Sequence, residues 1–468
     1  MRVISTRAAD GAPAVSLSEA LAAGLAPDGG LYVPEAFPVL GPREREALDS
    51  TPSLATVAQT ILGPFFREDT LEDALPELCA EAFSFPAPLV ELVDAAAARG
   101  TKGGSGEGSG AGGESGSGGG EPSPPQQALL ELFHGPTAAF KDYAARFLAG
   151  ALSRLPVQGG RHVLVATSGD TGAAVAAAFH GRPGFRVTVL YPEAGVSPRQ
   201  AHLLGCFGEN VQAFRVQGSF DDCQRLVKGA LTDPELRRRH GLTSANSISL
   251  GRLLPQMAYH SHAALRWKER FAAPGSPGSG DALPGFIIPS GNFGNALACL
   301  WARDLGLPIG EVILATNANR ALVDWLETGK ADPRPARRTL ANAMDVGIPS
   351  NLERLRWQHR GAPPGISAIS LSDHEIRKML AEAPRRWGQV VCPHTACGLR
   401  VLGDLRDGGD QRGWISVATA HPAKFPEVVE PEVGRPVPIP PAMAGWMDRS
   451  THAEPLKAEP RELARVLG

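Results

Sequence analysis

Lys141 is the side chain in this sequence whose surroundings most favour covalent chemistry. It stands in the segment HGPTAAFKD, residues 134–142, between an apolar run at 128–133 and a helix-like pattern at 143–149. This order predicts a strand, a turn and a helix, with Lys141 at the start of the helix. Burial lowers the pKa of a lysine, and the neutral amine can then form a Schiff base with a carbonyl compound. A solvated lysine at a helix end is the alternative that this segment alone leaves open.

Two glycine-containing segments are candidate anion sites. TSGDTG at residues 167–172 and PSGNFGN at 289–295 each follow an apolar run and precede a helical pattern. Small residues let the backbone approach a ligand, and the free amides at a helix N-terminus attract a phosphate or a carboxylate. Neither segment matches the phosphate-binding motifs of nucleotide-binding proteins. A capped turn without a ligand is the alternative for each segment taken alone.

The segment TAHPAKF at residues 419–425 follows another apolar run, at 414–418. A hydroxyl at a strand end, from Thr419, suits a pyridine nitrogen, and Lys424 is a cation suited to a phosphorylated substrate. Combined with Lys141 and the two anion-binding loops, these groups meet the requirements of pyridoxal phosphate. One loop would hold the cofactor phosphate, the lysine would hold its C4′ atom, and the other loop would hold a substrate carboxylate.

The elements that must position these groups alternate along the chain. Strands are predicted at 162–166, 186–190, 286–288, 312–315 and 414–418, and helices at 173–180 and 295–306. Such alternation predicts an α/β fold with a largely parallel sheet.

The chain length and composition divide the sequence into four regions. At 468 residues, with 43% hydrophobic and 20% charged residues, we expect two or three globular domains. Residues 1–95 read as a small, mostly helical domain with a short helix in 16–24. Residues 96–127 read as a flexible Gly/Ser-rich insertion, because they cannot bury enough apolar surface to order themselves. Residues 128–430 form the expected catalytic region of two α/β lobes, followed by a C-terminal extension at 431–468.

Charge and hydropathy narrow the class of protein further. The net charge of -3 predicts no nucleic-acid partner and no membrane surface, and no apolar run is long enough to span a bilayer. The N-terminus shows no signal peptide, and the six cysteines show no disulfide framework, so we expect a cytoplasmic protein. Cys392, His394 and Cys397 lack a fourth metal ligand, and no metal site is predicted.

Two N-terminal segments and four later ones, taken in order, resemble motifs of the threonine synthase family. These are the N-terminal segments STR (5–7) and APDGGLYVP (26–34), followed by HGPTAAFKD, TSGDTG, PSGNFGN and TAHPAKF. NSISLGR at 246–252 also resembles a family segment that lines the active site. The resemblance implies a fold-type II pyridoxal-phosphate enzyme with two open-twisted, mostly parallel α/β domains and a small N-terminal threonine-synthase domain.

The resemblance also implies roles for individual residues. Lys141 is implied to be the Schiff-base lysine, and Thr419 to face the ring nitrogen of pyridoxal phosphate. The residues implied to wrap the cofactor phosphate are Gly291, Asn292, Phe293, Gly294 and Asn295. The residues implied to bind the substrate are Thr167, Ser168, Gly169, Asp170, Thr171, Asn246, Ser247, Arg252 and Lys424. Arg252 is expected to bind the substrate phosphate, and a structural arginine paired with a carboxylate is its alternative.

The implied reaction converts O-phospho-L-homoserine and water to L-threonine and phosphate. A catabolic phospholyase on the same scaffold, which releases 2-oxobutyrate, phosphate and ammonia, is the principal alternative. A β-elimination or β-replacement enzyme would leave the N-terminal and TAHPAKF segments unexplained, and a cofactor-binding protein without activity is the alternative from another class. The sequence leaves a monomer and a homodimer both open.

Overall fold

A computed structural model describes residues 1–9, 11–50, 52–95, 126–157, 159–271, 283–332, 334–359 and 361–468. Apart from its last two residues, the expected insertion at 96–127 lies outside the described residues. A second Gly/Pro/Ser-rich segment, at 273–285, lies mostly outside them as well.

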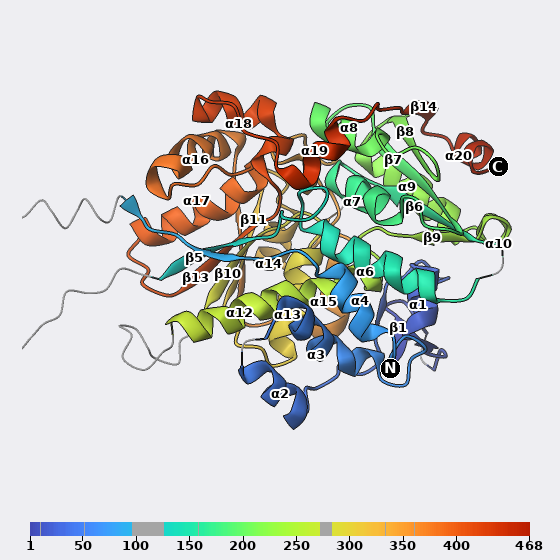
Figure 1. The fold of residues 1–468 in the computed structure, drawn as a ribbon, viewed down its shortest axis with the longest axis horizontal. Helices are drawn as coiled ribbons and strands as arrows, with labels where there is room; N and C mark the ends of the chain where they lie inside the picture. The colour runs from blue at the N-terminus through green and yellow to red at the C-terminus, as the bar shows by residue number, and fades with distance from the viewer. Residues whose placement is uncertain are drawn as a thin grey trace, which may run out of the picture.

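Two mostly parallel sheets form the centre of the molecule and confirm the predicted α/β class (Figure 1). In the six-stranded sheet only β4 runs antiparallel to its neighbour, and the five-stranded sheet is parallel throughout. The six-stranded order is β12 (Ile366–Ser370), β11 (Val312–Thr316), β10 (Gly285–Pro289), β13 (Trp414–Ala418), β5 (Gln127–Glu131) and β4 (Leu89–Glu91). The five-stranded order is β14 (Glu454–Lys457), β8 (Val211–Gln217), β7 (Phe185–Pro192), β6 (Arg161–Ala166) and β9 (Leu242–Ser244).

Helices cover both faces of each sheet, which is why the central strands read as continuous apolar runs. On the six-stranded sheet, α17 (Pro393–Asp407) packs on one face with α16 (Asp373–Arg386) behind it, and α13 (Gly294–Asp304) packs with α12 (Met257–Phe271) on the other (Figure 1). On the five-stranded sheet, α7 (Asp170–Phe179) and α9 (Phe220–Thr232) contact the strands. The remaining helices here are α6 (Lys141–Arg154), α8 (Pro198–Gly205), α10 (Pro234–His240), α11 (Leu250–Leu253), α14 (Ala321–Thr328), α15 (Leu352–His359) and the 3-10 turns η1 (Leu254–Gln256), η2 (Asn342–Met344) and η3 (Pro422–Lys424).

The first 95 residues combine helices with a small antiparallel sheet. Its order is β2 (Val15–Ser16), β1 (Arg2–Ser5) and β3 (Tyr32–Pro34), and none of these strands was predicted. The predicted short helix is α1 (Leu17–Ala23); a capping box at Ser16 begins it and Gly24 ends it. The other helices are α2 (Pro42–Asp49), α3 (Leu54–Phe66) and α4 (Leu75–Ala82). The structure places β4, from within residues 1–95, in the six-stranded sheet.

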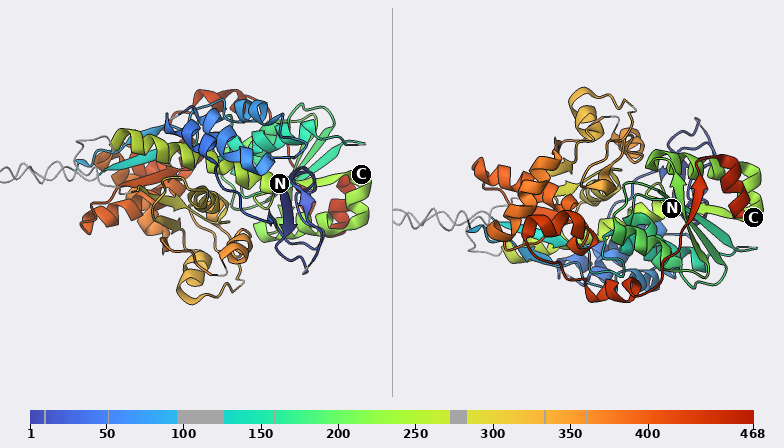
Figure 2. Two further views of the ribbon diagram at one scale, coloured as in Figure 1. Left: turned by 90° about the horizontal axis from the view of Figure 1, so that it is seen from below. Right: turned by 90° about the horizontal axis from the view of Figure 1, so that it is seen from above.

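The last residues of the chain return to the five-stranded sheet. After α18 (Pro426–Val433) and α19 (Pro441–Met447), β14 pairs in parallel with β8, and α20 (Pro460–Leu467) packs against α9 (Figure 2). Leu456, Leu463 and Leu467 are buried in that contact. The expected C-terminal extension therefore supplies an edge strand and a covering helix to this sheet.

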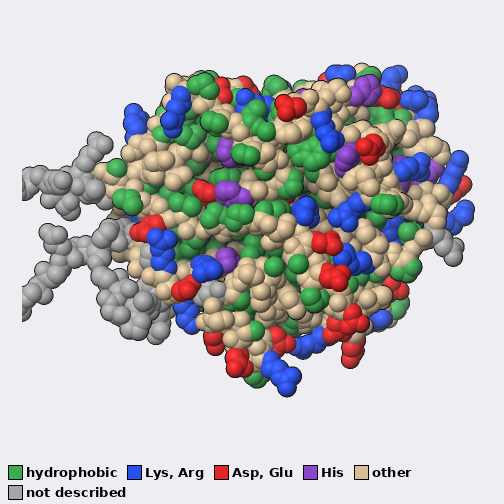
Figure 3. Space-filling view, viewed as in Figure 1, with side chains coloured by type: hydrophobic (Ala, Val, Ile, Leu, Met, Phe, Trp, Pro, Cys, Tyr) green, Lys and Arg blue, Asp and Glu red, His purple; other side chains and the backbone are tan. Residues whose placement is uncertain are grey.

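The surface carries charges of both signs. Lysine and arginine side chains are interspersed with aspartate and glutamate over the face shown in Figure 3. No helix among the described residues is long and apolar enough to cross a membrane.

Candidate active site

The candidate active site lies where the carboxyl ends of parallel strands from both sheets meet. The loops that follow β5, β6, β9, β10 and β13 carry its residues, so segments far apart in sequence line one pocket. Ligands commonly bind at this edge of parallel sheets. The pocket is lined by these predicted residues: Lys141, Ser168, Asp170, Thr171, Asn246, Ser247, Arg252, Gly291, Asn292, Phe293, Gly294, Asn295 and Thr419. Three further predicted residues, Thr167, Gly169 and Lys424, do not line it.

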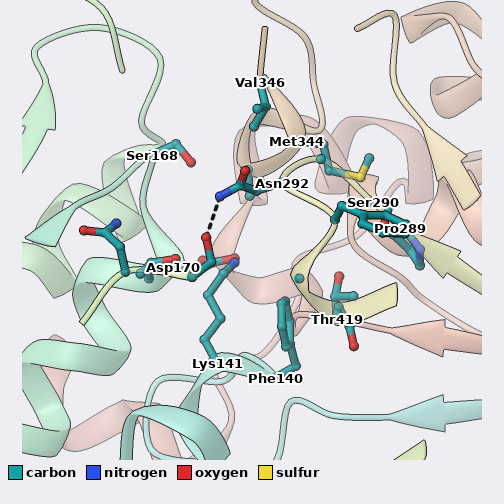
Figure 4. A pocket seen from close by; sticks show the side chains of 18 of the residues that line it. Phe140, Lys141, Ser168, Asp170, Pro289, Ser290, Asn292, Met344, Val346 and Thr419 are labelled. Carbon is teal, nitrogen blue, oxygen red and sulfur yellow. Dashed lines mark hydrogen bonds and ion pairs between the residues drawn. The ribbon is translucent and has the colours of Figure 1, made fainter. Parts of the chain in front are cut away.

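Lys141 is the first residue of α6, and its side chain extends into the pocket between Asp170 and Phe140 (Figure 4). Its Nζ lies 3.7 Å from Asp170 Oδ2 and 4.7 Å from the centre of the Phe140 ring. Burial lowers the pKa of Lys141; the Asp170 carboxylate acts in the opposite direction, and the charges of Lys424 and Arg252 lower it further. A buried lysine with a lowered pKa is suited to act as a nucleophile and as a proton acceptor.

The loop after β6 is shaped by two of the predicted residues that do not line the pocket. Thr167 Oγ1 accepts hydrogen bonds from the N–H groups of Gly169 and Gly172, both at 2.9 Å. Gly169 has a φ of 137°, and a Cβ there would lie 2.5 Å from the Gln200 side chain. Only glycine fits that position, and the resulting turn directs Ser168, Asp170 and Thr171 to the pocket.

The loop after β10 forms a cradle with the start of α13. Within the described part of the chain, the N–H groups of residues 291–295 donate no hydrogen bond to another backbone or side-chain group. A Cβ on Gly291 would lie 2.6 Å from Met344 Cα, and Phe293 turns the chain with a φ of 65°. Asn295 Nδ2 is buried and has no hydrogen-bond partner among the described residues. These free donors at a helix N-terminus fit a phosphate group.

Asn292 and Asn246 each connect two loops at the pocket wall. Asn292 Nδ2 donates to Ser247 Oγ at 2.5 Å, and its Oδ1 accepts from the Ser350 N–H at 2.6 Å. The amide of Asn246 pairs with the backbone of Ala166, donating to its carbonyl at 2.6 Å and accepting from its N–H at 3.1 Å. The NSISLGR segment is therefore tied to the ends of β6 and β10.

Arg252 is a buried cation in the pocket wall. Its Nη1 donates to the Ala245 carbonyl at 2.6 Å, and its Nε is buried without a partner. No carboxylate among the described residues forms an ion pair with Arg252. The structure therefore does not show the alternative role, a structural arginine paired with a carboxylate. Burial lowers the pKa of Arg252 to about 10. An anion in the pocket would supply the missing acceptor.

Thr419 stands at the end of β13 with its backbone held on both sides. Its N–H donates to Thr395 Oγ1 at 3.3 Å, and its carbonyl accepts from the Phe140 N–H at 2.9 Å. The second contact joins the loop that carries Lys141 to the strand end that carries Thr419.

His394 lines the pocket although it was not predicted to be a site residue. Its Nε2 accepts a hydrogen bond from the Ala343 N–H at 3.0 Å, and burial lowers its pKa to about 4. The imidazole is therefore neutral. Cys392 caps α17 through its Sγ, and the described residues contain no group of side chains arranged to hold a metal.

Ten further pocket residues were not predicted to be site residues. They are Phe140, Ala166, Phe220, Gln224, Gln256, Pro289, Ser290, Ala343, Met344 and Val346. Phe140 belongs to the HGPTAAFKD segment, and Pro289 and Ser290 belong to the PSGNFGN segment, whereas the other seven carried no sequence signal that separates them from core positions. Met344 is the last residue of η2, and Val346 follows it by two positions. Both are distant in sequence from the cradle, and the tertiary fold brings them beside it (Figure 4).

Comparison with known families places this fold and site in a class. A model described as "Pyridoxal-phosphate dependent enzyme" matches residues 128–422, and models described as "Threonine synthase N terminus" and "Threonine synthase, C-terminal" match residues 2–83 and 395–466. The chain is thus a fold-type II pyridoxal-phosphate enzyme.

Individual relatives agree over nearly the whole chain. Threonine synthase of Haemophilus influenzae is 37% identical, covering 91% of this chain and 90% of that protein, and the Escherichia coli enzyme is 34% identical, covering 97% and 96%. The crystal structure of E. coli threonine synthase superposes with a TM-score of 0.84 at 32% identity, covering 100% of this chain and 99% of that one. A pyridoxal-phosphate-bound threonine synthase from Brucella melitensis gives a TM-score of 0.79 at 32% identity, covering 100% and 98%. The chain belongs to the threonine synthase family.

Proposed function

We propose that this protein uses pyridoxal phosphate to convert O-phospho-L-homoserine and water to L-threonine and phosphate, as a lyase of threonine biosynthesis. The observation that carries the proposal is the position of Lys141. The Lys141 side chain is 15% exposed, and its amine lies beside Asp170 in a pocket that also holds the free amides of residues 291–295 and the Arg252 Nε, which has no partner among the described residues. One covalent attachment point and two separate places for anions are what a phosphorylated cofactor and a phosphorylated amino acid require.

The residues present fit the cofactor. Lys141 would hold it covalently, the cradle at 291–295 would bind its phosphate through backbone amides, and the Thr419 hydroxyl would donate a hydrogen bond to the ring nitrogen. When bound, pyridoxal phosphate supplies an electron sink for the electrons left on the substrate after a proton is removed. A hydroxyl rather than a carboxylate near the ring nitrogen leaves that nitrogen uncharged and moderates the sink.

The other pocket side chains would bind different groups of the substrate. Ser168 and Thr171, with the amides at the start of α7, would bind the substrate carboxylate. Arg252, Asn246 and Ser247 would bind its phosphate. Lys141 would take the Cα proton, because burial lowers its pKa and so favours the neutral amine, which can accept a proton. Enclosure of the pocket by Phe140, Met344 and Val346 would keep bulk water from the reacting atoms.

The decisive test measures products from one substrate. Purified holoenzyme incubated with O-phospho-L-homoserine should release phosphate and L-threonine in equal amounts. Release of phosphate with 2-oxobutyrate and ammonia would instead establish the phospholyase. A Lys141→Ala variant should lose both the visible absorbance of the bound cofactor and the turnover; retention of either would overturn the assignment of Lys141.

The remaining features of the proposal concern the protein as a whole. We propose that the substrate is a small molecule and that the protein, as a biosynthetic enzyme, is located in the cytoplasm. We also propose the division into an N-terminal domain at 1–95, a catalytic region of two lobes at 128–430 and a C-terminal extension at 431–468, with β4 and β14 joining the sheets across those boundaries.

A further inference from the structure

The sequence predicts that Lys424 binds a substrate phosphate. In the structure its side chain has no exposed surface and lies behind Asp170, away from the pocket. Its Nζ forms an ion pair with Asp170 Oδ1 at 2.8 Å and donates to the Thr137 carbonyl at 2.7 Å. The other carboxylate oxygen, Oδ2, faces Lys141 Nζ at 3.7 Å. One carboxylate thus stands between two lysines, and only Lys141 lines the pocket.

We propose that Lys424 is a positioning residue that neutralises and orients Asp170, so that the catalytic Lys141 nitrogen meets a balanced ion pair and not a free carboxylate. The inference rests on the proposed role of Lys141. Without the Lys424 cation, the Asp170 carboxylate would favour the protonated form of the Lys141 nitrogen. With that cation beside it, Asp170 still holds the Lys141 side chain in position but favours the protonated nitrogen less.

The contacts around the pair hold it in one arrangement. Gln200 Nε2 donates to Asp170 Oδ1 at 2.9 Å, and Gln200 Oε1 accepts from Asn342 Nδ2 at 2.8 Å. Ser197 Oγ donates to the Lys424 carbonyl at 2.7 Å. Asp170, Gln200 and Ser197 belong to the part of the chain around the five-stranded sheet, and Lys424 and Asn342 to the part around the six-stranded sheet. The pair therefore forms only when both parts are in place.

The other titratable groups near the lysines come from three helices. Arg252 on α11 adds a second cation that lowers the pKa of Lys141. His394, from α17, is neutral, and the thiol of Cys392 beside it has a pKa raised by burial. Asp142 on α6 is held by the N–H and hydroxyl of Thr137, and burial raises its pKa. For Asp170, burial alone would raise the pKa, but the charges of Lys424 and Lys141 outweigh it and hold the pKa well below its usual range.

The test is a pH titration of the visible absorbance of the holoenzyme, because the cofactor is attached to Lys141 Nζ and reports protonation of that nitrogen. Lys424→Met leaves Asp170 uncompensated and should raise the titration midpoint by about one pH unit, a tenfold change in the proton equilibrium. Asp170→Asn leaves the cations of Lys424 and Arg252 unopposed and should lower the midpoint. The double variant should return close to the unmodified midpoint.

Two charge controls accompany the series. Lys424→Arg keeps the cation and should keep the midpoint, and Lys457→Met removes an exposed lysine on β14 and should change nothing. Shifts of both single variants in the same direction, or a double variant that does not return, would overturn the proposal. A merely structural role for Lys424 predicts no rescue by Asp170→Asn.

A second measurement covers loss of cofactor or of folding in Lys424→Met. The rate at which an acylating reagent modifies Lys141 is followed against pH in the full-length chain freed of cofactor, with the modified peptide quantified by mass spectrometry. If Lys424→Met does not fold, the lowered midpoint of Asp170→Asn and the restored midpoint of the double variant still decide the question. None of these titrations requires turnover, so a failure of the proposed reaction in the product assay is distinguishable from a failure here.

Discussion

At the scale of single residues, the pocket brings together three buried polar atoms that have no partner among the described residues. Arg252 Nε, Asn295 Nδ2 and Ser290 Oγ are buried and unpartnered, and all three residues line the pocket. Buried polar groups are normally paired, because an unpaired one loses its hydration without compensation. In this pocket, beside the free N–H groups of residues 291–295, a bound anion would supply acceptors for Arg252 and Asn295.

Arg252 gives the clearest residue-scale prediction. Arg252→Met should raise the KM for O-phospho-L-homoserine about 30-fold, since a charge-assisted hydrogen bond to phosphate contributes about 2 kcal/mol. Steady-state kinetics provide the measurement. Arg238→Met, which removes an exposed arginine on α10, is the matched control and should leave KM unchanged. An Arg252→Met enzyme with normal KM would remove Arg252 from the substrate site.

At the scale of elements, the turn from β10 to α13 shapes the cradle that we propose for the cofactor phosphate. The chain approaches η2 so closely at Gly291 that no side chain fits there. The sequence motif indicated this turn, but the reason for its glycine is a contact with Met344, 53 positions further along the numbering.

Gly291→Ala should therefore displace the cradle and weaken cofactor binding by tenfold or more, about 1.4 kcal/mol. The dissociation constant for pyridoxal phosphate, measured by fluorescence titration, tests this. Gly445→Ala is the matched control, because it lies in α19, has nothing within 4 Å of the added Cβ, and should raise helix stability slightly. Equal cofactor affinity in both variants would contradict the steric argument.

Strand prediction succeeded for long strands with both faces buried and failed for strands that are partly exposed or, like β3 and β9, only three residues long. β6, β10, β11 and β13 are fully buried and were recognised as apolar runs. β8 alternates buried and exposed residues, and the edge strand β12 is only partly buried, so polar residues interrupt both patterns. The N-terminal strands β1 to β3 are two to four residues long, which is too short for a periodic signal.

At the scale of the whole molecule, buried histidines make stability depend on pH. Burial lowers to about 4 the pKa of His162, His260, His262, His394 and His421. In the unfolded chain a histidine titrates near 6.5, so unfolding takes up protons between these values. Stability is therefore fully present above about pH 6.5 and is lost as the pH falls toward 4, by up to roughly 1.4 kcal/mol per pH unit for each histidine. Burial also raises the pKa of Asp345 to about 7. Below that pH the folded chain binds one more proton at this residue than the unfolded chain, which offsets the effect of one histidine on stability.

Denaturant unfolding of the full chain at pH 7, 6 and 5 should show a falling midpoint. His162→Gln, at a buried position where the ring contacts Thr188 Oγ1 at 2.8 Å, should flatten this dependence. His452→Gln, at a side chain that is 83% exposed, should not. A midpoint that is constant from pH 7 to pH 5 would contradict the buried, neutral state of these histidines.

The sequence by itself determined the chemistry and the class of fold, because both depend on local patterns. Lys141 after a turn, glycines before two helices and a hydroxyl after an apolar run are visible without coordinates, and thirteen of the sixteen predicted site residues line the pocket. Alternation of apolar runs and helical patterns likewise follows from local burial.

Only the tertiary structure decided what faces what. Thr167 and Gly169 shape a loop from behind, His394 and Met344 reach the pocket from distant segments, and Lys424 meets Asp170 across 254 positions of the numbering. Such distances and the burial of a charge arise only when the two sheets are assembled. Whether a cation binds a ligand or pairs with a neighbouring carboxylate depends on that assembly. Lys424 pairs with the carboxylate of Asp170.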